Sequence, residues 1–600
     1  MCGIVGAISK NRNVLPILIT GLKNLEYRGY DSAGVAYLKN NKINIVKTSG
    51  KIIKLESKLN KNDKSNMGIA HTRWATHGKA NSINAHPHNV KHVTIVHNGI
   101  IENYEEIKEM LEKENYSFKS STDTEVACAL LNYYYEKFND VDKTIKAFMK
   151  KIIGSYAILM IIDNDLDNLY VMKKESPLVI GITDKTNIVA SDIRAILKYT
   201  NKYYILDDFE YARVNANEVV IKSVKGDILN KELHTIDIKD SDNYKGHYKH
   251  YMLKEIMEQK TTILKTVLPF IKEGLDSLKT LPDLTKYKEI TIVGCGTAYH
   301  AGLVAKYLFE EVTNTRCNVY LASEFRYQNN FLSKDTLTIF ISQSGETADT
   351  IAALKLVKSK NCPTLGIINV EDSTISYLVD TCLYTKAGSE IAVASTKAYT
   401  AQVALLSILA LSHGLRNKTI SKEKVLGVID EFNNIEKLIT PLLNNKDTYL
   451  SIAKTIYKEE DIFYIGRGLD YYLSMEGALK LKEISYIHSE AYAAGELKHG
   501  TISLIKKNTP VLASATNSCL NPKTISNLKE VLARGANIYL ICDDNYKDDT
   551  FTIVNIPKAS EFVKPILVII PYQLIAYYTA TLRGTDIDKP KNLAKSVTVE

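Results

Sequence analysis

The sequence is short of several features that would assign a protein class at once. Its eight cysteines include no Cys-x-x-Cys pair, so neither a thiol-exchange motif nor a paired-thiolate zinc site is expected. No run of about five or six like charges occurs, and the net charge of +8 is spread over 600 residues. We therefore expect no nucleic-acid partner, and free thiols in a reducing, cytoplasmic compartment.

A leader and a membrane span are also not expected. The first residues lack a charged-then-apolar pattern, because a short apolar stretch runs directly into the polar residues 10–13. The longest apolar stretch, 565–582, contains Pro571 and Gln573. It predicts a buried strand followed by a helix instead of a span of ~20 apolar residues. No membrane partner is predicted.

Two phosphate-binding signatures are missing as well. No Gly-Lys-Ser/Thr follows a glycine-rich loop, and neither Gly-x-Gly sequence of the chain continues as Gly-x-Gly-x-x-Gly. We therefore expect no cofactor. Apolar residues make up 45% of the chain and charged residues 24%, as in ordinary globular proteins. The length predicts about three or four domains.

The chain begins with the sequence MCGIVG. If Met1 is removed, Cys2 carries both a thiol and an α-amine, whose pKa of ~7.7 to 8.0 lets it act as a base near neutral pH. A thiolate nucleophile would then sit beside its own base. The alternative is that Cys2 has no special role.

Six of the thirteen histidines fall between His71 and His97, which raises the question of a metal site. The spacings do not fit one, since no His-x-x-x-His helix occurs and Arg73 would place a fixed cation among the ligands. We predict no bound metal.

The same region fits an acyl-transfer site better. Asn98 and Gly99 can offer a side-chain amide and a backbone N–H to an oxyanion, although Asn-Gly is also a common hairpin turn. Arg73 can hold a carboxylate, and Asp123 can hold an ammonium group or simply cap a helix. Together with Cys2, these groups describe hydrolysis of the amide of glutamine.

Four segments resemble the class II glutamine amidotransferase domain: residues 1–6, 25–34, 71–78 and 97–103. The resemblance implies an α+β N-terminal-nucleophile fold, in which two sheets are sandwiched between helix layers (αββα). It further implies that Cys2 is the nucleophile and that Trp74 gates an ammonia channel. The glutamine-binding residues it implies are Arg73, Thr76, His77, Asn98, Gly99 and Asp123.

The second half of the chain repeats itself. An apolar strand ends in Gly-x-Gly at Gly294 and again at Gly466, 172 positions later. Serines 48 residues after each glycine, Ser342 and Ser514, close a further strand. Because strands and helices alternate, we predict two copies of an α/β domain with a parallel, doubly wound sheet, after a polar boundary at 237–251.

The two copies differ in their polar residues. Residues 342–347, with the sequence SQSGET, precede a predicted helix at 348–358 and can form a cradle for a phosphate, or simply a well-capped helix start. The second copy has three charged residues at the spacing i, i+4, i+7, which places them on one helix face: Glu476, Lys480 and Glu483. Such a face is either a solvated salt-bridge face or a buried proton-shuttling site.

These motifs resemble the sugar isomerase (SIS) domain family, and the whole chain resembles the glucosamine-6-phosphate synthase family. The implied organisation is a glutaminase domain at 1–240, a linker with lead-in helices at 241–284, SIS domains at 285–425 and 450–590, and an active-site tail at 591–600. The implied catalytic residues are Glu483, which moves a proton between sugar carbons, Lys480, which assists, His499, which opens the ring, and Lys595, which forms a Schiff base. The implied sugar-phosphate ligands are Thr297, Ser342, Gln343, Ser344, Thr347, Ser395 and Glu483. From position alone, Lys595 would pass for a lysine of a frayed tail.

The resemblance implies glutamine-dependent amination and isomerisation of fructose 6-phosphate to glucosamine 6-phosphate, the first step of hexosamine biosynthesis, by a homodimer. Ala298, Ala392 and Thr501 depart from the residues common in the family and can soften a sugar contact. A glutaminase that feeds another acceptor is the alternative enzyme, but the loops of the related synthetases and phosphoribosyl transferases are missing. A sugar-phosphate-sensing module would not need Cys2, Glu483 or Lys595.

Overall fold

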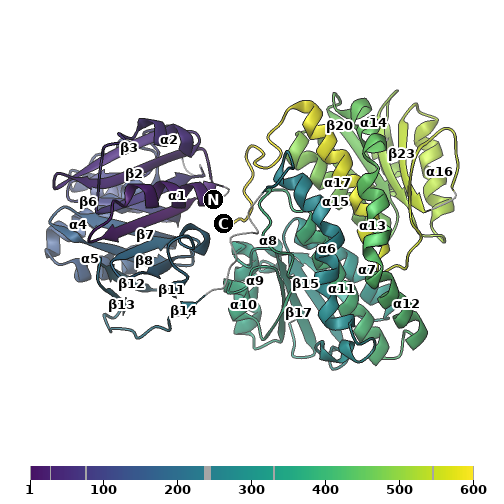
Figure 1. The fold of residues 1–600 in the computed structure, drawn as a ribbon, viewed down its shortest axis with the longest axis horizontal. Coiled ribbons are helices and arrows are strands. Elements are labelled where there is room, and N and C mark those ends of the chain that lie inside the picture. The colour runs from purple at the N-terminus through teal and green to yellow at the C-terminus, as the bar shows by residue number, and fades with distance from the viewer. Residues whose placement is uncertain are drawn as a thin grey trace. The chain divides into compact units, whose positions relative to one another are not determined.

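The computed structural model describes residues 2–26, 29–74, 78–235, 245–328, 332–543 and 546–598. The chain divides into two compact units (Figure 1), one formed by residues 1–240 with 596–600 and the other by residues 241–595.

The first unit contains two antiparallel sheets. The larger has eight strands in the order β14-β11-β9-β10-β1-β4-β2-β3, and the smaller has six in the order β13-β12-β8-β7-β6-β5. The strands of the larger sheet are β1 (Gly3–Ser9), β2 (Ser32–Lys39), β3 (Lys42–Ser49), β4 (Met67–Arg73), β9 (Val179–Ile182), β10 (Thr186–Ala190), β11 (Lys202–Ile205) and β14 (His234–Thr235). The strands of the smaller sheet are β5 (His88–Val90), β6 (Val93–Ile101), β7 (Gly154–Ile162), β8 (Asp165–Lys174), β12 (Glu210–Val214) and β13 (Val219–Ser223).

Side-chain alternation along β1 explains the layering. Val5 and Ala7 pack in one apolar cluster with α1 (Leu15–Leu25) on the outer face of the larger sheet. Ile4 and Ile8 point to the opposite face, into a cluster that joins the two sheets. The outer face of the smaller sheet is covered by helices α3 (Tyr104–Lys113), α4 (Asp123–Phe138) and α5 (Val141–Lys151), and α2 (Ile52–Lys58) lies beside β3. The predicted αββα sandwich is confirmed.

The second unit contains two parallel five-stranded sheets with the same topology. Their strand orders are β16-β15-β17-β18-β19 and β21-β20-β22-β23-β24, so each sheet is built in the order second, first, third, fourth, fifth. The first sheet consists of β15 (Glu289–Gly294), β16 (Arg316–Leu321), β17 (Thr336–Ser342), β18 (Thr364–Ile368) and β19 (Thr381–Tyr384). The second consists of β20 (Asp461–Gly466), β21 (His488–Ala493), β22 (Pro510–Ala515), β23 (Asn537–Asp543) and β24 (Thr552–Ile556).

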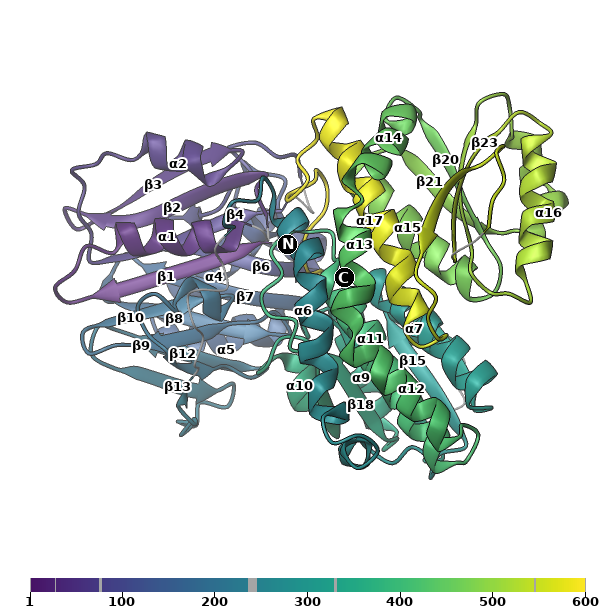
Figure 2. The same ribbon diagram turned by 45° about the vertical axis from the view of Figure 1, so that its right-hand side comes forward.

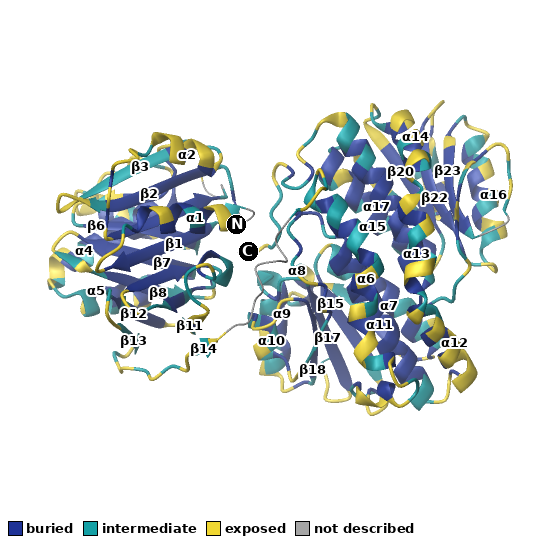
Figure 3. Cartoon of the chain, viewed as in Figure 1, coloured by how far each residue is buried: buried dark blue, intermediate teal, exposed yellow. Residues whose placement is uncertain are grey.

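Helices cover both sheets, and several run between them (Figure 2). Their bounds are α6 (Tyr251–Ile271), α7 (Thr297–Tyr307), α8 (Ala322–Phe325), α9 (Ala348–Ser359), α10 (Thr374–Leu378), α11 (Lys397–Arg416), α12 (Lys422–Asn433), α13 (Ile435–Asn444), α14 (Lys446–Ile456), α15 (Leu469–Ser485), α16 (Asn521–Leu532) and α17 (Lys564–Arg583). One apolar cluster contains residues of β15, β20 and the helices between them. Central strands are buried, whereas α12 and α16 each expose one face (Figure 3). The two SIS-like halves therefore share a core.

The repeated Gly-x-Gly sequences have the same geometry. Gly296 and Gly468 precede α7 and α15 with φ of 52° and 56°, in the left-handed region that favours glycine. A Cβ at Gly466 would lie 2.4 Å from the backbone of Asp470, so this glycine lets the strand approach the helix closely. The predicted duplication of one α/β domain is confirmed at this level of detail.

One prediction about the apolar stretch at 565–582 is wrong. It forms a single helix, α17, with Pro571 inside it, instead of a strand followed by a helix. An internal proline costs ~3 kcal/mol, but each fully buried Ile or Leu contributes ~1.5 to 3 kcal/mol, and Ile569, Ile570 and Tyr572 are completely buried. Helices α11 and α17 are long and apolar enough to span a membrane, but their most apolar windows are 94% and 83% buried inside the fold, which is typical of core helices.

Candidate functional site

Cys2 lies directly before β1, at the end of the strand pair that β1 forms with β4. The backbone N–H of Trp74, which follows β4, donates to Cys2 Sγ at 3.3 Å. Burial raises the pKa of the Cys2 thiol, while this N–H and the Arg73 guanidinium act in the opposite direction. A thiol in this environment needs a base to become a nucleophile.

The side-chain amide of Asn98 points at the same residue. Its Nδ2 donates to Cys2 O at 3.1 Å, and its Oδ1 lies 3.1 Å from His71 Nε2. His71 Nε2 also lies 3.0 Å from His97 O. Since both of these partners only accept, His71 carries its proton on Nε2. Burial lowers the pKa of His71 to about 3, so the ring is neutral. His71 thus fixes the amide of Asn98 with its donors toward Cys2, a role that the sequence reasoning missed.

Asn98 and Gly99 lie inside β6 instead of in a hairpin turn, so the turn alternative is wrong. Gly99 pairs with Tyr156 of β7 and has a φ of 128°. A Cβ at this position would lie 2.0 Å from Ser155 O. Only glycine fits here, and its conformation sets the direction of the neighbouring peptide groups.

Arg73 and Asp123 provide opposite charges beside the thiol. Arg73 is buried and donates to Gly78 O at 3.4 Å. Asp123, also buried, accepts from the backbone N–H of Ile101 at 2.9 Å. Both charges act on the Cys2 thiol. The N-cap of α4 is Thr122, so the alternative of Asp123 as a cap is wrong. Thr76 and His77 lie outside the described residues.

Two further buried histidines, His86 and His88, lie next to His71. The ring centroids of His71 and His86 are 4.1 Å apart, and those of His86 and His88 are 5.1 Å apart. Burial lowers the pKa of His86 and His88 well below the usual value. Within the described ranges, no group of three or more His, Cys, Asp or Glu side chains is arranged to hold a metal ion.

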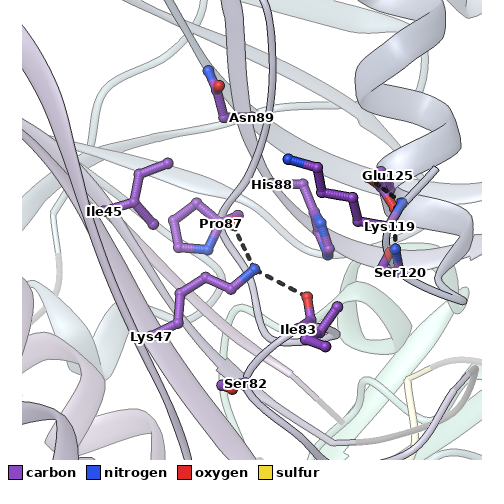
Figure 4. Close-up of a pocket in the computed structure, with 10 residues that line it drawn as sticks. All are labelled: Ile45, Lys47, Ser82, Ile83, Pro87, His88, Asn89, Lys119, Ser120 and Glu125. Atoms are coloured by element: carbon purple, nitrogen blue, oxygen red, sulfur yellow. Dashed lines mark hydrogen bonds between the residues drawn. The ribbon is translucent and has the colours of Figure 1, made fainter. Parts of the chain in front are cut away.

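A cavity of about 290 Å³ lies beside one of these histidines, His88 (Figure 4). Lys47 projects into it and donates to Ile83 O at 3.1 Å and Pro87 O at 3.3 Å. Burial lowers the pKa of Lys47 to about 8. His88 also lines the cavity, but none of the predicted site residues does.

In the second unit, residues 342–347 connect β17 to α9. Ser342 Oγ lies 3.1 Å from Thr347 Oγ1 and accepts from the Gly345 N–H at 3.0 Å, and Ser344 Oγ accepts from the Glu346 N–H at 3.1 Å. Thr347 is the N-cap of α9, but its side chain makes no capping hydrogen bond. The loop is preformed and Gln343 is half-buried within it. The Thr347 side chain does not use the backbone N–H groups at the start of α9. An anion cradle requires such N–H groups.

Glu476, Lys480 and Glu483 do share one face of α15, but that face is buried, so the solvated alternative is wrong. The side chains of Glu476 and Lys480 have an exposed fraction of 0%. Lys480 Nζ lies 2.6 Å from Glu483 Oε2 and 3.4 Å from Glu476 Oε1. Burial opposes the charge of Lys480, but the two carboxylates outweigh it and raise its pKa. Burial raises the pKa of Glu483, and Lys480 opposes this rise.

The first SIS-like half reaches this cluster through α7. Thr297 Oγ1 lies 3.1 Å from Glu476 Oε1 and accepts from Lys480 Nζ at 3.0 Å. His300 Nδ1 lies 2.7 Å from Glu476 Oε2. The sequence reasoning missed His300, although it follows Thr297 by three residues and so falls on the same helix face.

Lys595 is not part of a frayed tail, since only 4% of its side chain is exposed. It forms an ion pair with the buried carboxylate of Glu390, which also accepts from Ser395 Oγ at 2.8 Å. The charge of Lys595 also opposes the rise that burial causes in the pKa of Glu483 on α15. Sequence reasoning missed Glu390. The signal for it is an acidic residue directly before the apolar run 391–394, because such a position predicts a buried carboxylate.

His499 is the one predicted catalytic residue of this unit that stays apart. It is exposed at the end of a 3-10 helix (Glu496–His499). No hydrogen bond among the described residues joins it to Lys480, Glu483 or Lys595.

Comparisons with known proteins agree with this organisation. The SIS domain family matches residues 283–412 and 455–583, and a glutamine amidotransferase domain family matches residues 71–198. A solved structure described as the C-terminal domain of glucosamine-fructose-6-phosphate aminotransferase from Francisella tularensis covers 58% of this chain and all of its own, with 41% identity and a TM-score of 0.55.

Relatives that match over the full length identify the family of the whole chain. One from Caldanaerobacter subterraneus is 46% identical over 611 residues, and one from Clostridium acetobutylicum is 44% identical over 611 residues. A third, from Methanosarcina mazei, is 43% identical over 624 residues. In each case the similarity covers 100% of both chains, and each relative is named glutamine–fructose-6-phosphate aminotransferase (isomerizing). The chain therefore belongs to the family of glutamine–fructose-6-phosphate aminotransferases (isomerizing).

Proposed function

We propose that this chain converts glutamine and fructose 6-phosphate into glutamate and glucosamine 6-phosphate, the entry reaction of hexosamine biosynthesis. The observation that carries the proposal is the buried Glu476–Lys480–Glu483 face, with Lys595 as a further charge that acts on Glu483. The same chain holds a Cys2 thiol on which the opposite charges of Arg73 and Asp123 act. The full-length relatives support the same reaction.

In the glutaminase half, Cys2 attacks the side-chain amide of glutamine, ammonia leaves, and water hydrolyses the resulting thioester to glutamate and the free thiol. Removal of Met1 exposes the α-amine of Cys2, which takes the thiol proton and later donates it to the leaving ammonia. Asn98 and Gly99 stabilise the oxyanion with N–H donors. Arg73 binds the α-carboxylate and Asp123 the α-ammonium group, while Thr76 and His77 complete the glutamine site. Trp74, whose backbone contacts Cys2, is proposed to gate the path of ammonia.

In the sugar half, residues 342–347 hold the phosphate at the start of α9 through the groups of Ser342, Gln343, Ser344 and Thr347. The substrate and lysine then react as R-NH₃⁺ + O=C → R-NH⁺=C + H₂O at Lys595, and ammonia replaces Lys595 on C2.

Glu483 then moves a proton from C1 to C2, which converts the ketose skeleton into the aldose. Burial raises the pKa of Glu483, which favours a group that must act first as a base and then as an acid. Lys480 holds Glu483 in place, and Thr297 and Ser395 contact the sugar.

We propose further that the enzyme acts in the cytoplasm as a homodimer. All eight cysteines are free thiols, which fits a reducing compartment. The exposed His499, which has no partner in the α15 cluster, fits a site that a second subunit completes, where it would open the sugar ring.

The test measures two products, glutamate and glucosamine 6-phosphate, from the unaltered protein and from the Cys2→Ala variant. With glutamine and fructose 6-phosphate, the unaltered protein should form glutamate and glucosamine 6-phosphate in equal amounts. Cys2→Ala should form neither from glutamine, yet should still make glucosamine 6-phosphate from added ammonium. Glutamate without amino sugar from the unaltered protein would refute the proposed acceptor. Loss of the ammonium reaction in Cys2→Ala would contradict the separation of the two sites.

A further inference from the structure

Glu390 is the centre of a group of contacts around Lys595. Its Oε1 accepts from the backbone N–H groups of Thr396 and Ala398 at 2.9 and 3.0 Å. Its Oε2 accepts from Ser395 Oγ at 2.8 Å and from the Lys595 ammonium. One oxygen therefore holds the loop that leads into α11, and the other holds the two groups that are proposed to meet the sugar.

The charges around Glu390 leave it ionised. Burial opposes its charge, but Lys595 and the backbone donors outweigh burial and lower its pKa to about 2. Glu255 of α6 faces the same region and accepts from the N–H groups of Ile391 and Ala392 at 2.5 and 3.2 Å. Burial and the charge of Glu390 raise the pKa of Glu255 to about 8, so at neutral pH it is mostly protonated.

The other nearby charges are already paired. Lys397 of α11 lies 2.8 Å from Glu258, which also pairs with Lys254 at 2.5 Å. With Glu255 neutral, one anion, Glu390, faces one cation, Lys595. The charge of Lys595 also acts on Glu255 and on Glu483 of α15.

We propose that Glu390 is the counterion of the Schiff-base lysine: it positions the Lys595 ammonium beside Ser395 and stays paired with the protonated imine that Lys595 forms with the sugar. This inference rests on the proposed function. The reaction R-NH₃⁺ + O=C → R-NH⁺=C + H₂O moves no net charge off the nitrogen. The same buried carboxylate therefore stabilises the nitrogen before and after the bond to C2 forms.

The test is reductive trapping with fructose 6-phosphate and cyanoborohydride in the absence of glutamine, read as the mass added at Lys595. Glu390→Gln keeps an oxygen for the two backbone donors but puts an NH₂ group where Ser395 and Lys595 now donate. Trapping should fall by about 100-fold, and its pH profile should move to lower pH because the imine loses the anion that keeps it protonated. Glu390→Asp should restore part of the rate and the profile.

Two measurements separate this role from a merely structural one. Glucitol 6-phosphate has no carbonyl group, so its binding reports the phosphate site alone and should weaken much less than trapping does. The matched control, Glu258→Gln, removes a neighbouring carboxylate that pairs with Lys397 and not with Lys595, and should trap at the unaltered rate. Trapping by Glu390→Gln at the unaltered rate and pH profile would overturn the proposal, as would a parallel loss of glucitol 6-phosphate binding.

Failure of the proposed function gives a different result. If the unaltered protein makes glucosamine 6-phosphate but no adduct forms at Lys595, the counterion role is wrong and the function stands. If the adduct forms and depends on Glu390, but glutamine never yields amino sugar, the counterion role stands and the function is wrong.

Discussion

At the residue scale, the glutaminase site depends on a few atoms whose directions are fixed by buried neighbours. His71 orients the amide of Asn98 by donating to its oxygen, and the neutral state of His71 follows from its burial. Gly99 orients the next peptide group through a backbone conformation that other residues rarely adopt. The proposed oxyanion donors are therefore set before any substrate binds.

Gly99→Ala should remove glutaminase activity and destabilise the first unit. The new Cβ would meet Ser155 O at 2.0 Å, in addition to a backbone cost of about 1 to 3 kcal/mol at this φ. Glutamate release and urea unfolding measure the two effects. Gly274→Ala is the control, since it also has a positive φ of 64° but no atom within 4 Å of the added Cβ. It should cost only about 1 to 2 kcal/mol and leave glutaminase activity intact. An active Gly99→Ala protein would contradict the assignment.

Glu255 and Glu390 show how two buried carboxyls of one region can have opposite effects on stability. The pKa of Glu255 rises from 4.5 to about 8, so the stability linked to it is present below pH 4.5 and is lost as pH rises to about 8. The pKa of Glu390 falls to about 2, so its contribution is present above pH 4.5 and is lost as pH falls toward 2.

Glu255→Gln should therefore change the pH dependence of the melting temperature. The amide cannot ionise, so the variant should gain stability relative to the unaltered protein between pH 5 and pH 8.5, as measured by thermal melts at both values. Glu258→Gln, which removes a carboxylate whose pKa is lowered by Lys254 and Lys397, should not show this gain. An equal difference in melting temperature at both pH values for Glu255→Gln would be inconsistent with a raised pKa.

At the element scale, α15 carries three charged residues on a buried face between the two sheets. The spacing of Glu476, Lys480 and Glu483 predicts that they share a face, and they do. Spacing alone does not tell whether that face is solvated, because burial depends on α7 and α17, which are remote in sequence. The structure decides in favour of burial.

Lys480→Met should destabilise the second unit by about 3 to 5 kcal/mol, because it leaves two buried carboxylates without their cation. Chemical unfolding of the purified protein measures this loss. Lys498→Met is the matched control. Lys498 lies 2.8 Å from Glu530, but its side chain is 53% exposed, so the loss should be at most about 1 kcal/mol. Equal losses in the two variants would show that the α15 face is solvated.

The sequence was sufficient for most of the elements, and it pointed to candidate residues inside recognisable motifs, such as Cys2, Asn98 and the loop at 342–347, whose roles stay predictions. It was not sufficient for contacts that bring remote segments together. Glu390 meets Lys595 across 205 positions, and His300 meets Glu476 across 176. The strand wrongly predicted at the start of α17 has a similar cause, since apolar packing on all sides offsets the proline.

At the scale of the whole molecule, the two proposed reaction sites belong to two compact units of one chain. Each unit gathers charged and polar groups of its own, the first around Cys2 and the second around Lys480 and Lys595. Neither site by itself accounts for an amino sugar made from glutamine. The central claim is therefore that the nitrogen released at Cys2 becomes the amino group of the sugar.

Isotope transfer tests this claim most directly. The protein is given fructose 6-phosphate and glutamine labelled with ¹⁵N in the side-chain amide, in the presence of unlabelled ammonium, and the product is analysed by mass spectrometry. The account predicts glucosamine 6-phosphate that carries ¹⁵N, formed in the same amount as glutamate. Glutamate accompanied only by unlabelled amino sugar, or by none, would contradict it.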